Sequence, residues 1–252
     1  MATHLLVDNS NSFTKFALCS QTAVGEVRKL ATREVSAEAV WGLIADWRFE
    51  GAVVCSVVPA KGAVLREALA GGPLVMVDAT VDLGIGIDYP EPGTIGADRL
   101  ANAVAAARLH PTPAVVVDFG TALTFDIVST EGNYLGGVIA PGLEAMTEYL
   151  SQRTALLPRI ALLEPPGIIG KSTNDAMLAG AVYGYRGLVR EILGKLREVL
   201  EKEVPLKVVA TGGYAELIAA GVQEIHEVQP LLTLEGLRLI ANRHFAQNTP
   251  VN

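Results

Sequence analysis

An internal repeat constrains the fold of this chain more than any other feature of its sequence. Apolar residues 5–7 lead into Asp8, a small polar turn and a second apolar segment. Apolar residues 115–117 lead in the same way into Asp118, a short turn and another apolar segment. Short apolar runs bounded by turn residues predict strands, so each copy predicts a strand, a tight turn and a returning strand. Two similar halves in one chain predict a duplicated α/β domain.

The rest of the chain predicts further strands and helices around the two copies. Strands are expected at residues 52–58, 74–77 and 208–210, and helices at residues 99–109, 173–199 and 230–245. Residues 110–113 contain two prolines and interrupt the apolar pattern. We therefore place the boundary there, which gives an N-terminal subdomain of residues 1–112, a C-terminal subdomain of residues 113–252 and a central cleft between them.

Composition excludes several classes of function. The chain has 252 residues, of which 50 % are hydrophobic, and a formal net charge of -7. An acidic chain lacks the basic surface that nucleic acids need, so no nucleic-acid partner is expected. No apolar run approaches the roughly 18 residues of a membrane span, and the N-terminal residues show no secretory signal pattern, so we expect a cytoplasmic protein without a membrane partner. Cys19 and Cys55 lie in apolar runs and predict buried thiols.

The two Asp-centred turns are candidates for a phosphate site. Turns of small residues present backbone N–H groups to an anion, and an Asp at the end of a buried strand can face a cation. The alternative is an ordinary tight hairpin in which the Asp serves only as a turn residue. Because two matching turns occur in one chain, we favour the phosphate site.

The paired turns resemble the two phosphate loops of the superfamily that contains actin, sugar kinases and heat-shock ATPases. A third element of that superfamily is a Gly-Gly turn after a late strand, which contacts adenosine. Thr211-Gly212-Gly213 follows apolar residues 208–210 and fits that element. The resemblance implies an α/β fold with duplicated actin-like ATPase domains of the ribonuclease H-like type.

Finer motifs are similar to those of type III pantothenate kinases. They are Gly96-Ala97-Asp98-Arg99, residues 118–126, 136–142 and 170–173, and, ahead of these, residues 56–59 and Tyr89. They occur in collinear order over most of the chain. The resemblance implies that ATP phosphorylates pantothenate to 4′-phosphopantothenate, the first step of coenzyme A biosynthesis. It also implies Mg²⁺ with ATP, a monovalent cation (K⁺ or ammonium) and a homodimer with its substrate site near the subunit interface.

The same resemblance implies roles for individual residues. Asp98 would be the catalytic base, and Asp118 would bind the monovalent cation. The pantothenate site would contain Tyr89, Gly96, Ala97, Asp98, Arg99 and Thr173, with Thr173 reaching the partner subunit's site. The ATP site would contain Asp8, Asn9, Ser10, Asn11, Ser12, Phe13, Thr14, Lys15 and Thr121.

Asp98 also suits this role on physical grounds. It lies just before a predicted helix, where the N–H groups and the helix dipole favour negative charge. We therefore expect its carboxylate to stay ionised. The alternative is an ordinary helix N-terminal carboxylate, with Arg99 as a surface charge.

The first turn departs from the family pattern, which reads D-x-G-N-T. Ser10 stands in place of the glycine. A serine is tolerated, and can add a donor, if the turn has ordinary φ angles, whereas a positive φ or a close backbone approach would weaken ATP binding. Lys15 either contacts phosphate or is an exposed strand lysine. Two alternative functions follow: a non-catalytic or regulatory relative with weakened nucleotide binding, or a kinase for another small hydroxyl substrate.

Overall fold

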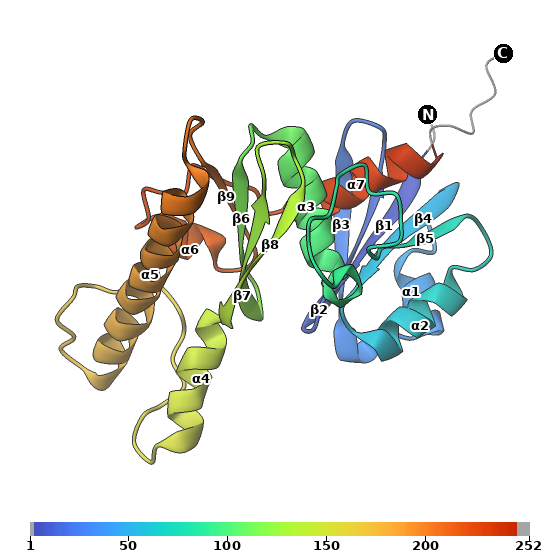
Figure 1. The fold of residues 1–252 in the computed structure, drawn as a ribbon. Coiled ribbons are helices and arrows are strands. Elements are labelled where there is room, and N and C mark those ends of the chain that lie inside the picture. The colour runs from blue at the N-terminus through green and yellow to red at the C-terminus, as the bar shows by residue number, and fades with distance from the viewer. Residues whose placement is uncertain (1–2, 246–252) are drawn as a thin grey trace. The chain divides into compact units, whose positions relative to one another are not determined.

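The computed structural model describes residues 3–245, which form two compact α/β units (Figure 1). The first unit consists of residues 3–110, 132–136 and 231–245. The second consists of residues 111–131 and 137–230. Each unit is built on a five-stranded sheet.

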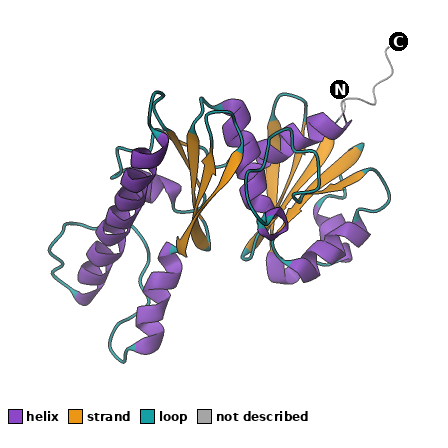
Figure 2. Cartoon of the chain, in the orientation of Figure 1, coloured by secondary structure: helices purple, strands orange, loops and turns teal. Residues whose placement is uncertain are grey.

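The sheet of the first unit has the strand order β3-β2-β1-β4-β5. These strands are β1 (His4–Asn9), β2 (Phe13–Cys19), β3 (Val24–Ala31), β4 (Gly51–Ser56) and β5 (Leu74–Met76). The helices are η1 (Thr32–Glu34), α1 (Ala37–Leu43), α2 (Pro59–Ala68), η2 (Pro92–Thr94), α3 (Ala97–Leu109) and α7 (Leu232–Phe245). Leu5 and Val7 pack with α1 and α2, whereas α7 covers the other face of the sheet together with α3 (Figure 2).

The sheet of the second unit has the order β10-β9-β6-β7-β8. These strands are β6 (Ala114–Phe119), β7 (Ala122–Val128), β8 (Tyr134–Pro141), β9 (Lys207–Thr211) and β10 (Glu227–Val228). The helices are α4 (Leu143–Arg153), α5 (Thr173–Leu200) and α6 (Ala215–Ala219). The long helix α5 buries one face against the sheet, through residues that include Val182, Tyr185 and Val189.

The two sheets share one topology, which confirms the predicted duplication. In each, the strand that ends in the repeated Asp pairs antiparallel with the next strand and parallel with a later one. Asp8 lies opposite Cys55 of β4, and Asp118 lies opposite Thr211 of β9. The expected α/β fold with duplicated actin-like domains is therefore confirmed in its topology.

Most of the predicted elements are present, with small shifts at their ends. The helices predicted from residues 99, 173 and 230 begin at Ala97, Thr173 and Leu232. The sequence patterns did not predict β3, whose residues are mostly half-buried or exposed and carry charges, nor β8 and β10. They also did not predict the helices α1, α2, α4 and α6. Such segments have weak apolar periodicity because little of their surface faces the core.

The C-terminal helix α7 packs within the first unit rather than with the second half of the chain. Gly236 makes this possible, because a Cβ atom there would lie 2.0 Å from the carbonyl oxygen of Ala101 on α3. Thr233 of α7 also donates a hydrogen bond to Asn102 of α3 (Oγ1 to Oδ1, 2.8 Å). The predicted subdomain limits, residues 1–112 and 113–252, remain a proposal. The first unit differs from the predicted N-terminal subdomain because it also contains α7.

Both cysteines are buried and free, as predicted. Across residues 3–245, none of the helices has the length and apolar character needed to span a lipid bilayer.

Candidate active site

The first Asp-centred turn holds its carboxylate in a fixed orientation. Asp8 is buried at the end of β1, with 2 % of its surface exposed. Ser10 Oγ donates a hydrogen bond to Asp8 Oδ1 at 2.9 Å, and Lys15 Nζ pairs with Asp8 Oδ2 at 3.2 Å. Lys15 faces Asp8 directly in the β1–β2 register. Its ammonium group is thus held at the turn rather than free on an exposed strand.

The backbone of this turn does not require a glycine at position 10. Among residues 3–245, every positive φ angle belongs to a glycine, so Ser10 has an ordinary φ. Its repeat partner Gly120 also has no positive φ, and a Cβ atom there would lie 3.4 Å from Asp118 Oδ1, an ordinary contact. The ordinary φ meets the condition under which the sequence predicts that a serine is tolerated, and Ser10 adds a hydrogen bond to Asp8.

The turn is braced by neighbouring polar side chains. Thr32 accounts for two of the contacts: its Oγ1 donates to the carbonyl of Ser10 at 2.7 Å, and its backbone N–H donates to the carbonyl of Ser12 at 3.0 Å. Ser56 Oγ donates to Asn9 Oδ1 at 2.7 Å. A turn fixed in this way is preorganised, so a bound anion need not order it.

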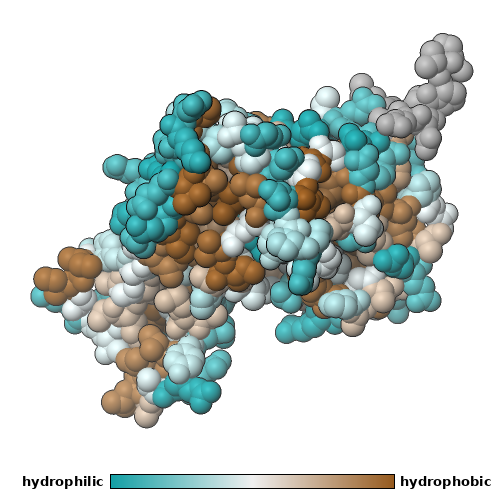
Figure 3. Space-filling view, viewed as in Figure 1, coloured by the Kyte–Doolittle hydropathy of each residue, from teal (hydrophilic) through white to brown (hydrophobic). Residues whose placement is uncertain are grey.

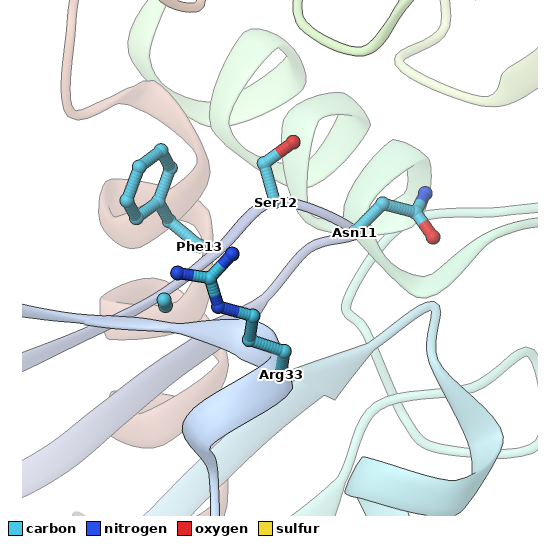
Figure 4. Close-up of a pocket in the computed structure, with 5 residues that line it drawn as sticks. Asn11, Ser12, Phe13 and Arg33 are labelled. Atoms are coloured by element: carbon cyan, nitrogen blue, oxygen red, sulfur yellow. The ribbon is translucent and has the colours of Figure 1, made fainter.

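A hollow of about 380 Å³ lies beside the turn. Asn11, Ser12, Phe13, Ala31 and Arg33 line it. Figure 4 shows the guanidinium group of Arg33 pointing toward Phe13 and the turn. Arg33 is the only charged residue of these five, and 86 % of its side chain is exposed. Sequence reasoning missed Arg33, because only the β3–η1 connection brings it to the turn.

Asp98 lies in the first turn of α3, and its carboxylate is largely shielded from water. Its Oδ1 accepts a hydrogen bond from the backbone N–H of Arg99 at 2.8 Å. Burial raises the pKa of Asp98, with a further upward contribution from the negative charge of Asp8. These effects outweigh the N–H group and the charge of Arg99, so the pKa of Asp98 is raised, although the helix N-terminus alone would lower it.

Gly96 and Ala97 shape the space around this carboxylate. A Cβ atom at position 96 would lie 2.7 Å from Asp98 Oδ1, so a larger residue there would displace the carboxylate. Ala97 is buried at the start of α3. The predicted G-x-D-R motif therefore has a steric reason for its glycine.

Tyr89 and Arg99 meet around a third residue, Tyr134, which sequence reasoning did not single out. The ring centroids of Tyr89 and Tyr134 are 6.2 Å apart, and Arg99 Cζ lies 5.9 Å from the centre of the Tyr134 ring. Gly136 has a φ of +119°, and a Cβ atom there would lie 3.3 Å from the Tyr89 ring. The structure thus brings Tyr89 and Arg99, two residues predicted to bind pantothenate, to one place. Arg99 directly follows Asp98 in the chain.

The second Asp-centred turn is surrounded by two of the glycine motifs. Gly212 has a φ of +94°, and a Cβ atom there would lie 2.6 Å from Asp118 Oδ1. Gly142 lies so close to the turn that its Cβ would be 2.2 Å from the carbonyl oxygen of Thr121. The Gly-Gly turn after β9 and the glycine before α4 therefore converge on Asp118 and Thr121.

Thr173 is exposed at the first position of α5, in the same unit as Asp118 and Thr121. Ser172 caps this helix by accepting a hydrogen bond from the backbone N–H of Asp175 at 3.1 Å. The residues predicted for pantothenate are thus divided between the units, since Tyr89, Asp98 and Arg99 belong to the first.

The side chains of residues 3–245 include no group of three or more His, Cys, Asp or Glu residues that could hold a metal ion.

Comparison with known proteins identifies the family. The family model for type III pantothenate kinases matches residues 4–195. A type III pantothenate kinase of Akkermansia muciniphila is 53 % identical over 240 residues, covering 95 % of this chain and 98 % of that protein. Among solved structures, a protein described as a Baf family transcriptional activator from Campylobacter jejuni matches with a TM-score of 0.59 at 20 % identity, covering 95 % of this chain and 98 % of the other. An inorganic polyphosphate/ATP-glucomannokinase from Arthrobacter matches with a TM-score of 0.52 at 15 % identity, covering 97 % of this chain and 100 % of the other, which again reflects a shared fold. With its motifs, its duplicated sheets and a match over three quarters of its length, the chain belongs to the type III pantothenate kinase family.

Proposed function

We propose that Asp98 acts as the base when this kinase transfers the γ-phosphoryl group of ATP to pantothenate. The product is 4′-phosphopantothenate, at the first step of coenzyme A biosynthesis. The observation that carries the assignment is the half-buried carboxylate of Asp98 at the start of α3, whose pKa is raised by its surroundings. A raised pKa makes this carboxylate a stronger proton acceptor than an exposed one.

Phosphoryl transfer needs correct positioning more than covalent chemistry from the protein. The pantothenate hydroxyl would give its proton to a carboxylate oxygen of Asp98 as its own oxygen attacks phosphorus. Gly96 and Ala97 leave room for that hydroxyl. Arg99 would pair with the carboxylate of pantothenate, and Tyr89 would pack against its apolar part.

ATP would bind through its phosphates at the first turn, from Asp8 to Lys15, and at Thr121. Lys15 is held at this turn, and Arg33 supplies a second positive charge beside it. Mg²⁺ would enter with the phosphates and neutralise their charge. Asp118 would bind the monovalent cation, K⁺ or ammonium, together with oxygens of the turns that surround it.

A homodimer is supported by an exposed apolar surface on the second unit. Figure 3 shows hydrophobic side chains over α4 and the segment between α4 and α5. The exposed residues there include Met146, Tyr149, Leu156, Leu163, Ile168 and Ile169, and Ile139 of β8 is exposed as well. Exposed apolar side chains gathered in this number commonly mark an interface. Thr173 directly follows this segment, which would let it reach the partner subunit's pantothenate site.

A coupled assay of ADP release tests the activity directly. We expect ADP release that depends on pantothenate and is stimulated by K⁺ or ammonium. ADP release without pantothenate, or none with K⁺ present, would contradict the proposal, and a panel of small hydroxyl compounds would then reveal another substrate.

Light scattering of the purified protein tests the dimer. The predicted cytoplasmic location is open to test by cell fractionation.

A further inference from the structure

The segment that carries Tyr89 begins at a cluster of charged side chains. Arg243 Nη2, at the end of α7, pairs with Asp82 Oδ2 at 2.8 Å. Asp82 Oδ1 accepts a hydrogen bond from the backbone N–H of Gly84 at 3.1 Å. Arg108, near the end of α3, donates to the carbonyl oxygen of Gly84. His244 Nε2 lies 3.0 Å from the carbonyl oxygen of Asp82. Two helices therefore hold this end of the segment.

The packing at Gly84 shows that the contact with Arg243 is close. Gly84 has a φ of +75°, and a Cβ atom there would lie 3.2 Å from Arg243 Cδ. The arginine side chain thus covers a backbone that only glycine adopts easily. The pairing also lowers the pKa of Asp82, chiefly through its hydrogen bond with Arg243.

The other end of the segment pairs with the backbone of Tyr134. The N–H of Tyr134 donates to the carbonyl of Gly86 at 2.9 Å, and the N–H of Asp88 donates to the carbonyl of Tyr134 at 2.8 Å. Residues 82–88 are therefore fixed at both ends, and Tyr89 follows at once. Because the same Tyr134 ring lies against Tyr89 and Arg99, the position of this segment determines how these two side chains face each other.

We infer that the Asp82–Arg243 ion pair, together with Arg108, positions the Tyr89 segment and thereby sets the affinity for pantothenate. None of these three residues needs to touch the substrate. They act through the backbone of residues 82–88, while α3 carries Arg108 at one end and Asp98 at the other. This inference rests on the proposed pantothenate site.

Steady-state kinetics of four variants test the inference. Asp82→Asn keeps an oxygen for the Gly84 N–H but removes the charge, and Arg243→Gln removes the other partner. Because the pair is exposed, each should raise KM for pantothenate modestly, by about fivefold, with kcat and KM for ATP nearly unchanged. The double variant should be no worse than either single one, since both remove one interaction. Arg243→Lys should stay close to the wild type.

Lys195→Gln is the matched control, because it breaks an exposed ion pair with Glu198 on α5, outside this segment. It should leave both KM values unchanged. Additive effects of the two single variants, a fall in kcat with unchanged KM for pantothenate, or an equal rise in both KM values would overturn the inference.

Hydrogen exchange measured by mass spectrometry separates this inference from the proposed function. Without substrate, Arg243→Gln should speed exchange in the peptide that covers residues 82–89, and Lys195→Gln should not. Unchanged exchange would refute the positioning role. Faster exchange in a protein that shows no pantothenate-dependent ADP release would uphold the anchoring of the segment and refute the substrate assignment.

Discussion

Replacing Asp98 with asparagine should reduce turnover and stabilise the fold at the same time. Asparagine has nearly the same shape and can still accept the hydrogen bond from the Arg99 N–H. It cannot accept the proton of the pantothenate hydroxyl. A positioned base contributes about 10² to 10⁴ in rate, or about 3 to 5 kcal/mol, so we expect kcat to fall by about that factor.

The stability effect follows from the direction of the pKa shift. Burial and the charge of Asp8 raise the pKa of Asp98 in the folded protein above its unfolded value. Folding is therefore favoured by the protonated form, and this contribution is lost as the pH rises through the folded pKa. Once the pH exceeds this folded pKa, the wild type holds a half-buried charge that asparagine lacks. The variant should melt at a higher temperature at pH 7 and show little difference in acid.

The assay combines ADP release with thermal unfolding followed at several pH values. Glu38→Gln is a suitable control, because Glu38 is an exposed acidic residue in the first turn of α1. It should change kcat little and lose at most about 1 kcal/mol of helix stabilisation. Near-normal turnover of Asp98→Asn would refute its role as the base. A lower melting temperature at pH 7 would refute the argument from burial.

Three further predictions concern the first unit. Ser10→Gly removes the hydrogen bond to Asp8 but relieves no backbone strain. A hydrogen bond of about 1 kcal/mol corresponds to a roughly fivefold change in affinity, so KM for ATP should change by less than about fivefold; a marked fall in KM would show that serine obstructs the nucleotide. Arg33→Gln should raise KM for ATP about fivefold and leave KM for pantothenate unchanged, whereas Arg66→Gln, at another exposed arginine, should change neither. Within residues 3–245, the buried His4 has no hydrogen-bond partner for Nδ1, and burial lowers its pKa from the ordinary 6.5. Its neutral form therefore stabilises the fold above that value, and the melting temperature should fall in mild acid, less so in His4→Phe; equal acid sensitivity of both proteins would contradict this assignment.

The sequence by itself determined the duplicated plan of this protein and the positions of its motifs. Strands of apolar residues that end in Asp8 and Asp118 are local patterns, and local patterns predict strands and turns without knowledge of the rest of the chain. The glycines at positions 96 and 212 were likewise found as motifs. The structure supplied their physical reason, which is the close approach of each to an Asp carboxylate.

Only the tertiary structure decided which distant residues support these motifs. Arg33 reaches the first turn through the order of strands, and Arg243 reaches Asp82 because α7 packs on α3. Neither contact produces a periodic pattern in the sequence. The pKa shift of Asp98 depends on burial and on Asp8, ninety positions earlier in the chain, and the local helix end does not reveal either effect. Burial and long-range charge are properties of the folded chain, and a local sequence pattern does not contain them.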